Sequence, residues 1–223
     1  MKLFIDSANL REIEEALQRG VVSGITTNPS ILSKEEKGDF HAHIGKILEL
    51  IDRHHVRIPL SVEVFTDRPD EMLSQALHLV DHFNRPSNLV VKIPIGWDEL
   101  AVIQRLRHEG IQVNCTCCMS YNQATMATLA GATYVSLFWG RVKDTGSDPA
   151  VVVRQVRTTL TEGGHPAEII VGSIRHLMDI NEAFQAGADI VTVPFKFLEP
   201  MTRHPKTDEA VRQFIDDFRR WST

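Results

Sequence analysis

Lys92 is the residue of this sequence whose type and position favour the most distinctive chemistry. It lies in the apolar run Val90-Val91-Lys92-Ile93, where a charge is unusual because buried parallel strands are mostly aliphatic. Desolvation disfavours the ammonium form, and a neutral amine can attack a carbonyl carbon to form a Schiff base. The resulting iminium accepts electrons from a neighbouring carbon–carbon bond as that bond breaks. The sequence therefore predicts a lysine nucleophile in a buried strand.

Two carboxylates, Asp6 and Glu63, occupy comparable positions in other apolar runs. They can divide the proton transfers, one acting on a substrate hydroxyl and the other through a water during imine formation and hydrolysis. An uncompensated buried charge is very costly, so we expect Lys92, Asp6 and Glu63 to share one hydrated, hydrogen-bonded network. Each of these residues could instead have a structural role. Lys92 could pair with either carboxylate, Asp6 could be the N-cap of the first helix, and Glu63 could be an ion-pair partner.

Short apolar runs alternate with longer amphipathic segments along the chain, which predicts strands connected by crossover helices. Eight such units favour a closed parallel (β/α)8 barrel, the TIM-barrel class of α/β folds, as one domain over residues 1–223. A doubly wound sheet is the alternative, but no G-x-G-x-x-G motif follows a strand. The predicted strands are 2–6, 24–27, 60–64, 89–93, 112–116, 134–138, 168–173 and 189–193.

A further helix is predicted at 207–223, after the eighth strand, with Thr207 as its N-cap. Its apolar face must be buried on its own subunit or on a neighbouring one. That face comprises Ala210, Val211, Phe214, Ile215, Phe218 and Trp221.

Polar residues near the carboxyl ends of the predicted strands share one face, because alternate strand residues point the same way. The intervening residues, such as Leu3 and Ile5, are aliphatic and should face the helices. We therefore expect the polar set to point into the barrel mouth, although each member could instead be a satisfied cap at a strand end. Asn28 before Pro29 is also a common loop pair. Besides the three charged residues, the set comprises Thr26, Asn28, Asn114, Thr116, Ser136 and Ser173.

Arg141 and Arg175 follow the sixth and seventh strands, where barrels often bind phosphate. Single arginines after strands are also often solvated surface residues. Lys196 follows the last strand, and we interpret it as opening a helix. His78 and His82 lie four apart on a predicted helix, on what we expect to be an exposed face.

The 223 residues have a formal net charge of -5 and scattered basic residues, which disfavours nucleic acid or anionic lipid as a partner. The first residues lack the apolar region of a signal peptide, and no later run reaches membrane-spanning length. Cys115, Cys117 and Cys118 crowd one segment without disulfide or zinc spacing, and we expect them to be packing residues. These features favour a cytoplasmic protein with a small-molecule substrate.

The chain resembles the short, single-barrel branch of the transaldolase family along nearly its whole length. The residues that carry the resemblance are Phe4-Ile5-Asp6, Gly24-Ile25-Thr26-Thr27-Asn28-Pro29-Ser30, Ser61-Val62-Glu63-Val64, Val90-Val91-Lys92-Ile93-Pro94, Val113-Asn114-Cys115-Thr116, Tyr134-Val135-Ser136, Gly140-Arg141, Gly172-Ser173-Ile174-Arg175 and Val191-Thr192-Val193-Pro194-Phe195-Lys196.

The resemblance implies that Lys92 forms a Schiff base with a ketose phosphate and that Asp6 acts on the hydroxyl at the cleaved bond. Glu63 and Thr116 would hold the water used in imine formation. A dihydroxyacetone unit would pass from sedoheptulose 7-phosphate or fructose 6-phosphate to an aldose phosphate, as in the pentose phosphate pathway, without metal or organic cofactor. The substrate-binding residues that we expect are Asn28, Thr26, Asn114, Ser136, Phe138, Ser173 and, as a phosphate clamp, Arg141 and Arg175.

A related branch, similar to fructose-6-phosphate aldolase, releases free dihydroxyacetone. It typically has Gln where this chain has Glu63 and Tyr where it has Phe138, so both positions favour transfer. A barrel that only binds sugar phosphates is a third hypothesis, which the retained charged set disfavours. Trp139 and Cys117-Cys118-Met119 depart from the family pattern, and the bulky Trp139 could reshape the acceptor or phosphate pocket. The branch also implies a homo-oligomer, a pentamer or decamer.

Overall fold

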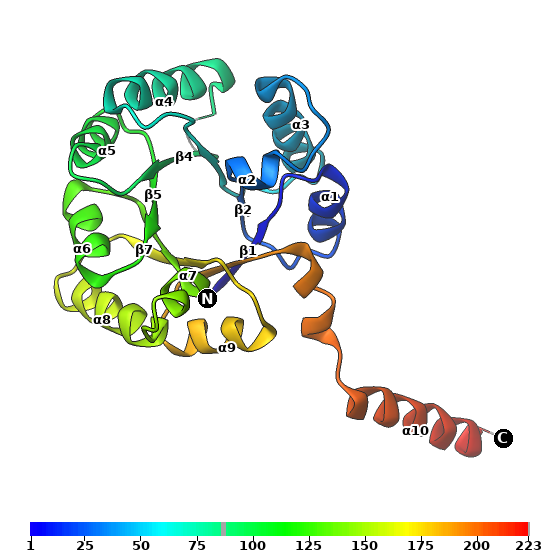
Figure 1. Ribbon diagram of the computed structural model, residues 1–223. Helices are drawn as coiled ribbons and strands as arrows, with labels where there is room; N and C mark the ends of the chain where they lie inside the picture. The colour runs from blue at the N-terminus through cyan, green and yellow to red at the C-terminus, as the bar shows by residue number, and fades with distance from the viewer. Residues whose placement is uncertain (86–87, 223) are drawn as a thin grey trace.

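Eight parallel strands close into a barrel in the computed structural model, which describes residues 1–85 and 88–222 (Figure 1). Each strand pairs with its neighbours in sequence, and β8 pairs with β1. The predicted TIM barrel is confirmed. The strands are β1 (Lys2–Asp6), β2 (Ile25–Thr26), β3 (Leu60–Glu63), β4 (Leu89–Pro94), β5 (Val113–Cys118), β6 (Tyr134–Phe138), β7 (Glu168–Gly172) and β8 (Ile190–Val193).

Helices surround the barrel, and most begin at residues that sequence chemistry favours (Figure 1). Asn9 caps α1 by accepting from the amides of Arg11 and Glu12, so the reading of Asp6 as that N-cap is wrong. Asp39, Ser120 and Asp148 cap later helices in the same way. The helices around the barrel are α1 (Leu10–Gln18), α2 (Pro29–Leu32), α3 (Phe40–Arg53), α4 (Pro69–Phe83), α5 (Glu99–His108), α6 (Tyr121–Ala130), α7 (Trp139–Asp144), α8 (Pro149–Glu162) and α9 (Leu177–Gln185), followed by the short turns η1 (Phe195–Phe197) and η2 (Pro200–Thr202).

Six of the eight strands differ from their predicted bounds by one or two residues, and β2 and β5 differ at both ends. The regular part of β2 covers only two residues, although the Thr27 amide still donates to Ser61 O at 3.0 Å. At its start, Gly24 lies against the Phe4 ring, and a Cβ there would be 2.4 Å from a ring carbon. In contrast, β5 runs to Cys118 through an irregularity in its pairing with β6, where Cys117 adopts a φ of 62°. Close packing and a bulge thus set these bounds, and neither is visible in hydrophobic spacing.

The core has two layers, as the strand alternation predicts. A large cluster between strands and helices contains Ile5 and Val62, with Leu3 packed against it. A smaller cluster fills the inside of the barrel at its amino-terminal end with buried apolar side chains. This cluster, which we call the floor, comprises Phe4, Val90, Tyr134, Ile170 and Ile190.

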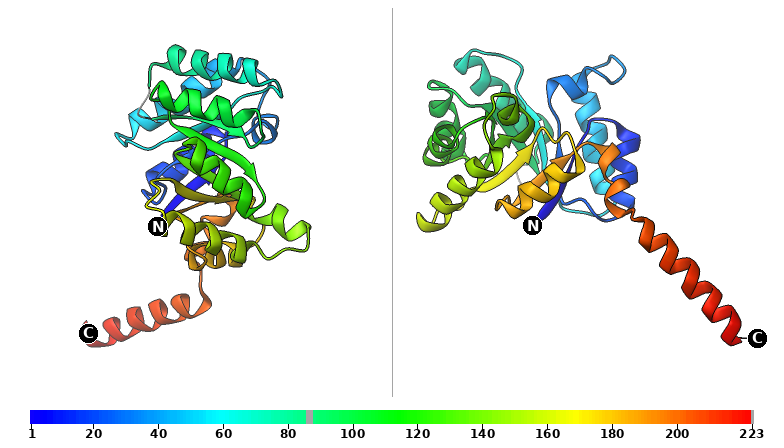
Figure 2. Two further views of the ribbon diagram at one scale, coloured as in Figure 1. Left: turned by 90° about the vertical axis from the view of Figure 1, so that its left-hand side faces the viewer. Right: turned by 60° about the horizontal axis from the view of Figure 1, so that its bottom comes forward.

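Helix α10 (Pro205–Ser222) extends away from the barrel (Figures 1 and 2). It begins two residues before the predicted N-cap Thr207, because Pro205 is suited to a first helical turn; Thr223 lies outside the described residues. Its apolar face is exposed, to 68% at Phe214 and 81% at Trp221. Within residues 1–85 and 88–222, no helix has the length and apolar character needed to cross a membrane.

Candidate functional site

Lys92 lies inside the barrel above the floor and is only 5% exposed. Its ammonium nitrogen is 2.8 Å from Glu63 Oε2 and donates to Thr27 O at 2.8 Å. Glu63 is its direct register partner on β3, so parallel pairing places both side chains on the inner face. The lysine is therefore held by a carboxylate and a carbonyl from two neighbouring strands.

Asp6 lies at the end of β1 and belongs to a second hydrogen-bonded group. Thr26 Oγ1 donates to Asp6 Oδ1 at 2.7 Å and lies 2.6 Å from Thr192 Oγ1. Burial raises the pKa of Asp6 above its ordinary value, although the Thr26 hydrogen bond and the positive charge of Lys92 oppose the rise. A carboxyl group in this state is suited to exchange a proton with a substrate hydroxyl.

The three charged residues lie together at the mouth, as predicted. They do not form one hydrogen-bonded network, however, but two separate groups. Lys92 pairs directly with Glu63, whereas Asp6 bonds to Thr26 and influences Lys92 through space. The amine and the Asp6 carboxyl are thus two separately bonded groups at one barrel mouth.

A third group of inward polar side chains comes from β3, β5 and β6. Ser136 Oγ donates to Asn114 Oδ1 at 2.7 Å, and Asn114 Nδ2 donates to Ser61 Oγ at 3.3 Å. These bonds fix the orientation of the Asn114 amide. Thr116 Oγ1 is fully buried and has no partner at hydrogen-bond geometry within the described part of the chain, although it interacts with the neighbouring Cys117 thiol and partly offsets the rise that burial causes in the pKa of that thiol. Buried hydroxyls normally find a full partner.

Ser61 and Thr192 are inward polar residues that the sequence interpretation missed. Both were detectable, because Ser61 lies two residues before Glu63 and Thr192 is the polar residue of an otherwise aliphatic β8. The alternation rule that selected the other residues applies equally to these two.

Asn28 caps α2, since its Oδ1 accepts from the Ile31 amide at 3.0 Å. The amide oxygen of Asn28 therefore has a structural role, which was the alternative to substrate binding. Phe138 ends β6 and Ser173 follows β7, both partly buried. Ser173 has a φ of 58°, which is uncommon for a residue other than glycine.

Arg141 and Arg175 are exposed, beyond the carboxyl ends of β6 and β7. Both terminal nitrogens of Arg175 donate to the Asp144 carboxylate at 2.6 Å. Arg175, and to a smaller extent Arg141, lowers the pKa of Asp144. Of the two arginines of the predicted phosphate clamp, Arg175 is therefore bonded to Asp144, whereas Arg141 acts on that carboxylate only through space.

Trp139 does not line the mouth, so any effect of its bulk on the acceptor or phosphate pocket is indirect. It is 1% exposed in the outer core, and its Nε1 donates to Asp179 at 3.1 Å. Cys115 and Cys118 are packing residues as expected, whereas Cys117 is partly exposed, and burial followed by the charge of Glu63 raises the pKa of its thiol.

Lys196 is exposed in η1, with its nitrogen 5.0 Å from the Phe197 ring centre. His78 and His82 are exposed on α4 as expected, and both rings stack edge-on against His41 of α3. Over the described ranges, no three His, Cys, Asp or Glu residues are grouped so that they could hold a metal.

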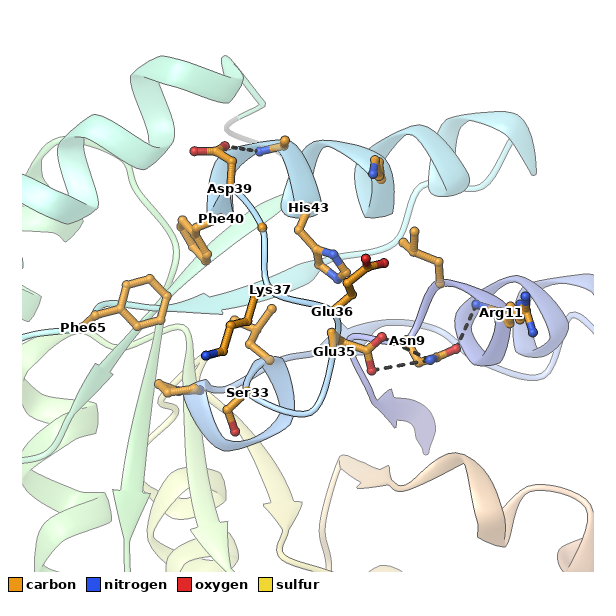
Figure 3. Close-up of a pocket in the computed structure, with 16 residues that line it drawn as sticks. Asn9, Arg11, Ser33, Glu35, Glu36, Lys37, Asp39, Phe40, His43 and Phe65 are labelled. Carbon is orange, nitrogen blue, oxygen red and sulfur yellow. Dashed lines mark hydrogen bonds between the residues drawn. The ribbon is translucent and has the colours of Figure 1, made fainter.

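A cavity of about 920 Å³ lies beside the barrel, between α1, α2 and the start of α3 (Figure 3). Lys37, Glu35 and His43 border it, and Phe65 borders it two residues beyond Glu63. None of the charged residues of the barrel mouth lines this cavity. The charged residues of the mouth therefore lie inside the barrel, not in this cavity.

The fold and its polar mouth define a class: (β/α)8-barrel proteins with a buried lysine–carboxylate pair at the carboxyl ends of the strands. Residues 3–223 match the model of the transaldolase/fructose-6-phosphate aldolase family. The chain is 39% identical to a probable transaldolase of Dehalococcoides mccartyi and 41% identical to probable transaldolase 1 of Listeria monocytogenes, over 98% of both chains in each case. It is also 38% identical to a probable transaldolase of Thermoplasma volcanium, over 100% of this chain and 97% of the other. The chain therefore belongs to the transaldolase/fructose-6-phosphate aldolase family and is a transaldolase-type enzyme.

Proposed function

We propose that this protein is a transaldolase that moves a dihydroxyacetone unit from a ketose phosphate to an aldose phosphate through a Schiff base on Lys92. The observation that carries the proposal is the buried pair of Lys92 and Glu63, 2.8 Å apart, at the mouth that also holds Asp6. A protein that only binds sugar phosphates has no need for a desolvated amine beside two separately bonded carboxyl groups. Sedoheptulose 7-phosphate and fructose 6-phosphate are the proposed donors.

Glu63 is the base closest to the amine in the Lys92 pair. It takes a proton from the ammonium, and the free amine attacks the ketose carbonyl carbon. Loss of water from the adduct then forms the iminium, with a proton delivered through a water held between Glu63 and Thr116. Thr116 is the inward hydroxyl two residues after Asn114 on β5, and its Oγ1 has no hydrogen-bond partner in the described residues, so it is free to take this role when the site binds substrate and water.

Asp6 acts in the next step as the base that removes the proton of the hydroxyl at the cleaved bond. The carbon–carbon bond breaks, its electron pair moves to the iminium, and an enamine and an aldose phosphate result. The enamine then attacks the aldehyde of the acceptor, and Asp6 returns the proton to the new hydroxyl. The raised pKa of Asp6 supports both directions of this transfer.

The polar residues around the reacting groups would bind the sugar, and the arginines would bind its phosphate. Asn114 is oriented by Ser136 and Ser61 and can exchange hydrogen bonds with sugar hydroxyls. In the clamp, phosphate would replace Asp144 as the partner of Arg175, since two oxygens of either group can accept both N–H donors of the planar guanidinium. Thr26, Asn28, Phe138 and Ser173 complete the proposed lining.

Borohydride trapping tests this function. The pure protein is mixed with fructose 6-phosphate, with and without erythrose 4-phosphate, and is then reduced and analysed by mass spectrometry. A three-carbon adduct on Lys92 and turnover only with the acceptor are expected. Absence of the adduct would sink the Schiff base, and free dihydroxyacetone without acceptor would favour the aldolase-type lyase instead.

We further propose that residues 1–223 work as one barrel domain in the cytoplasm, in a homo-oligomer such as a pentamer or decamer. The exposed apolar face of α10 supports the assembly, because an unburied face with Phe214, Phe218 and Trp221 is unfavourable in water. Light scattering of the chain and of a variant ending at residue 204 tests it. If the shortened variant has the same number of subunits per particle as the full chain, a role for α10 in assembly is contradicted.

A further inference from the structure

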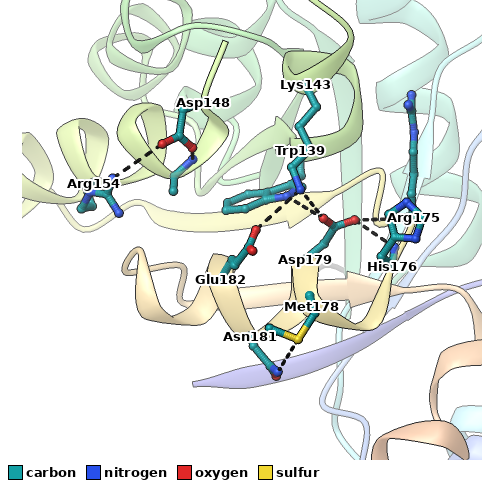
Figure 4. A network of polar contacts seen from close by, with 11 residues as sticks. Trp139, Lys143, Asp148, Arg154, Arg175, His176, Met178, Asp179, Asn181 and Glu182 are labelled. Carbon is teal, nitrogen blue, oxygen red and sulfur yellow. Dashed lines mark hydrogen bonds and ion pairs between the residues drawn. The ribbon is translucent and has the colours of Figure 1, made fainter. Parts of the chain in front are cut away.

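Asp179 is a buried carboxylate that holds together two segments outside the barrel. It is 1% exposed, and each of its oxygens serves a different segment (Figure 4). Oδ1 accepts from Trp139 Nε1 at 3.1 Å and from Lys143 Nζ at 2.6 Å, both on α7. Oδ2 accepts from the backbone amides of Arg175 at 3.0 Å and His176 at 2.9 Å. One carboxylate thus links α7 to the loop between β7 and α9.

These two segments carry the two arginines of the proposed phosphate clamp. Arg141 lies on α7 between Trp139 and Lys143, and the Arg175 amide is itself one of the donors to Asp179. The segments are also in direct contact, because the Gly140 amide donates to Ser173 O at 3.0 Å. A displacement of α7 relative to the loop would therefore change the spacing of the two arginines.

A second link between the same segments is the ion pair of Arg175 and Asp144. Both side chains are nearly half exposed, and such surface pairs contribute little because water and salt screen them. The Asp179 side chain is only 2% exposed, and its bond to the buried Trp139 ring is shielded from water. Its bond to Lys143 is partly screened, because the Lys143 side chain is 43% exposed. The buried link is therefore the one expected to set the geometry.

Capping of α9 alone does not account for this arrangement. The backbone amides of Arg175 and His176 satisfy the capping function at Oδ2. The Trp139 and Lys143 donors add nothing to the cap of α9, but they fix the position of α7. The Lys143 ammonium also lies 5.6 Å from the centre of the Trp139 ring, which joins both donors into one packed unit.

We propose that Asp179 is a positioning residue that, through Trp139 and Lys143, sets the spacing of Arg141 and Arg175 and thereby the preference of the site for phosphorylated over unphosphorylated sugars. This inference rests on the proposed function and deepens it. Asp179 touches no substrate; it acts through the arginines.

The variants Trp139→Phe and Lys143→Met each remove one donor from Oδ1 while leaving the α9 cap intact. Glu182→Gln is the matched control, because Glu182 is the other, more distant acidic partner of Lys143 at 3.5 Å and lies on the exposed surface. Steady-state KM and kcat are measured with fructose 6-phosphate as donor, and with erythrose 4-phosphate and erythrose as acceptors. Borohydride trapping with dihydroxyacetone, which has no phosphate, reports the Lys92 chemistry separately.

We expect Trp139→Phe and Lys143→Met to raise KM for fructose 6-phosphate about tenfold and to lower the preference for erythrose 4-phosphate over erythrose by a similar factor, about the effect of losing one hydrogen bond. In both variants, the yield of the dihydroxyacetone adduct and kcat with erythrose should match those of the unsubstituted protein. The control Glu182→Gln should match the unsubstituted protein in every measurement. Reduced thermal stability with an unchanged phosphate preference would overturn the inference, since a merely structural role predicts that result.

The two proposals fail in different ways. If the unsubstituted protein forms no Lys92 adduct, the proposed function fails, and calorimetric titration with inorganic phosphate then tests the clamp alone. Weaker phosphate binding in Trp139→Phe and Lys143→Met would still support the positioning role, and unchanged binding would overturn it. If the adduct forms but phosphate preference is unchanged in both variants, only the inference fails.

Discussion

Glu63 and Lys92 are direct register partners on adjacent parallel strands, with their charged atoms 2.8 Å apart and their side chains 15% and 6% exposed. Removing one partner of a buried pair leaves the other charge uncompensated. Lys92→Met should therefore lower the free energy of unfolding at pH 7 by about 3 kcal/mol, and the double variant with Glu63→Gln should recover most of that loss. Urea unfolding measures both. Additive effects of the two substitutions would contradict a coupled pair.

Asp6→Asn should remove activity but not stability. Burial raises the pKa of Asp6 in the folded protein, so its ionised form opposes folding: the stability it contributes is complete below the ordinary pKa and is lost as pH rises through the raised pKa. A neutral Asn avoids this loss and can still accept the Thr26 hydrogen bond. We expect a higher Tm at pH 7 and turnover reduced at least about 100-fold.

The matching pH experiment compares unfolding of both proteins from pH 3 to pH 8. The difference in favour of Asp6→Asn should grow with pH above the ordinary pKa of an aspartic acid and level off once Asp6 is ionised. A variant that is less stable at pH 7 would show that the Asp6 charge supports the fold.

Thr116→Val should separate stability from chemistry in a similar way. The buried Oγ1 has no partner at hydrogen-bond geometry in the described residues, and leaving such a group unsatisfied costs free energy. Valine keeps the shape without the hydroxyl, so we expect the free energy of unfolding to change by no more than about 1 kcal/mol. Formation of the Lys92 adduct should become slower, measured by borohydride trapping at timed intervals. Thr116→Ser, which keeps the hydroxyl, is the control and should form the adduct at nearly the original rate.

Gly140→Ala should disturb the contact between α7 and the loop after β7. A Cβ at this position would lie 2.6 Å from Ser173 O and 2.5 Å from Arg175 Nε, closer than carbon atoms tolerate. Because the first of these atoms is backbone, the strain should cost about 2 kcal/mol in thermal unfolding. Gly38→Ala is the matched control, since its Cβ would meet only Glu36 O at 3.9 Å. Equal stability of the two variants would contradict a tight contact.

The alternation of side chains was sufficient to predict much of the mouth from sequence. It places Lys92 and Glu63 inward on neighbouring strands, and it separates them correctly from Ile5 and Val62 in the outer core. The rule ends at Phe138, because Trp139 is the first residue of α7 and lies buried in the outer core. The expectation that its bulk reshapes the pocket stays a prediction, and it can hold only through the groups that Trp139 contacts.

Contacts between distant segments were beyond the reach of sequence patterns. The bond from Thr26 to Asp6 and the pairing of Arg175 with Asp144 depend on how loops approach one another in three dimensions. Periodicity indicates the face on which a side chain lies, not which of several polar neighbours it meets. The position of α10 is a similar case, because an apolar helical face shows that a partner surface is needed without indicating which one.

The floor made by Phe4, Tyr134 and their neighbours closes the barrel below Lys92. Substrates and products of the proposed active site therefore enter and leave through the mouth at the carboxyl ends of the strands. For the proposed exchange, the first aldose must depart before the second can enter, because both would use the same passage and the same arginines. The two half-reactions would then alternate in time, and initial rates plotted reciprocally against donor at several acceptor concentrations would give parallel lines.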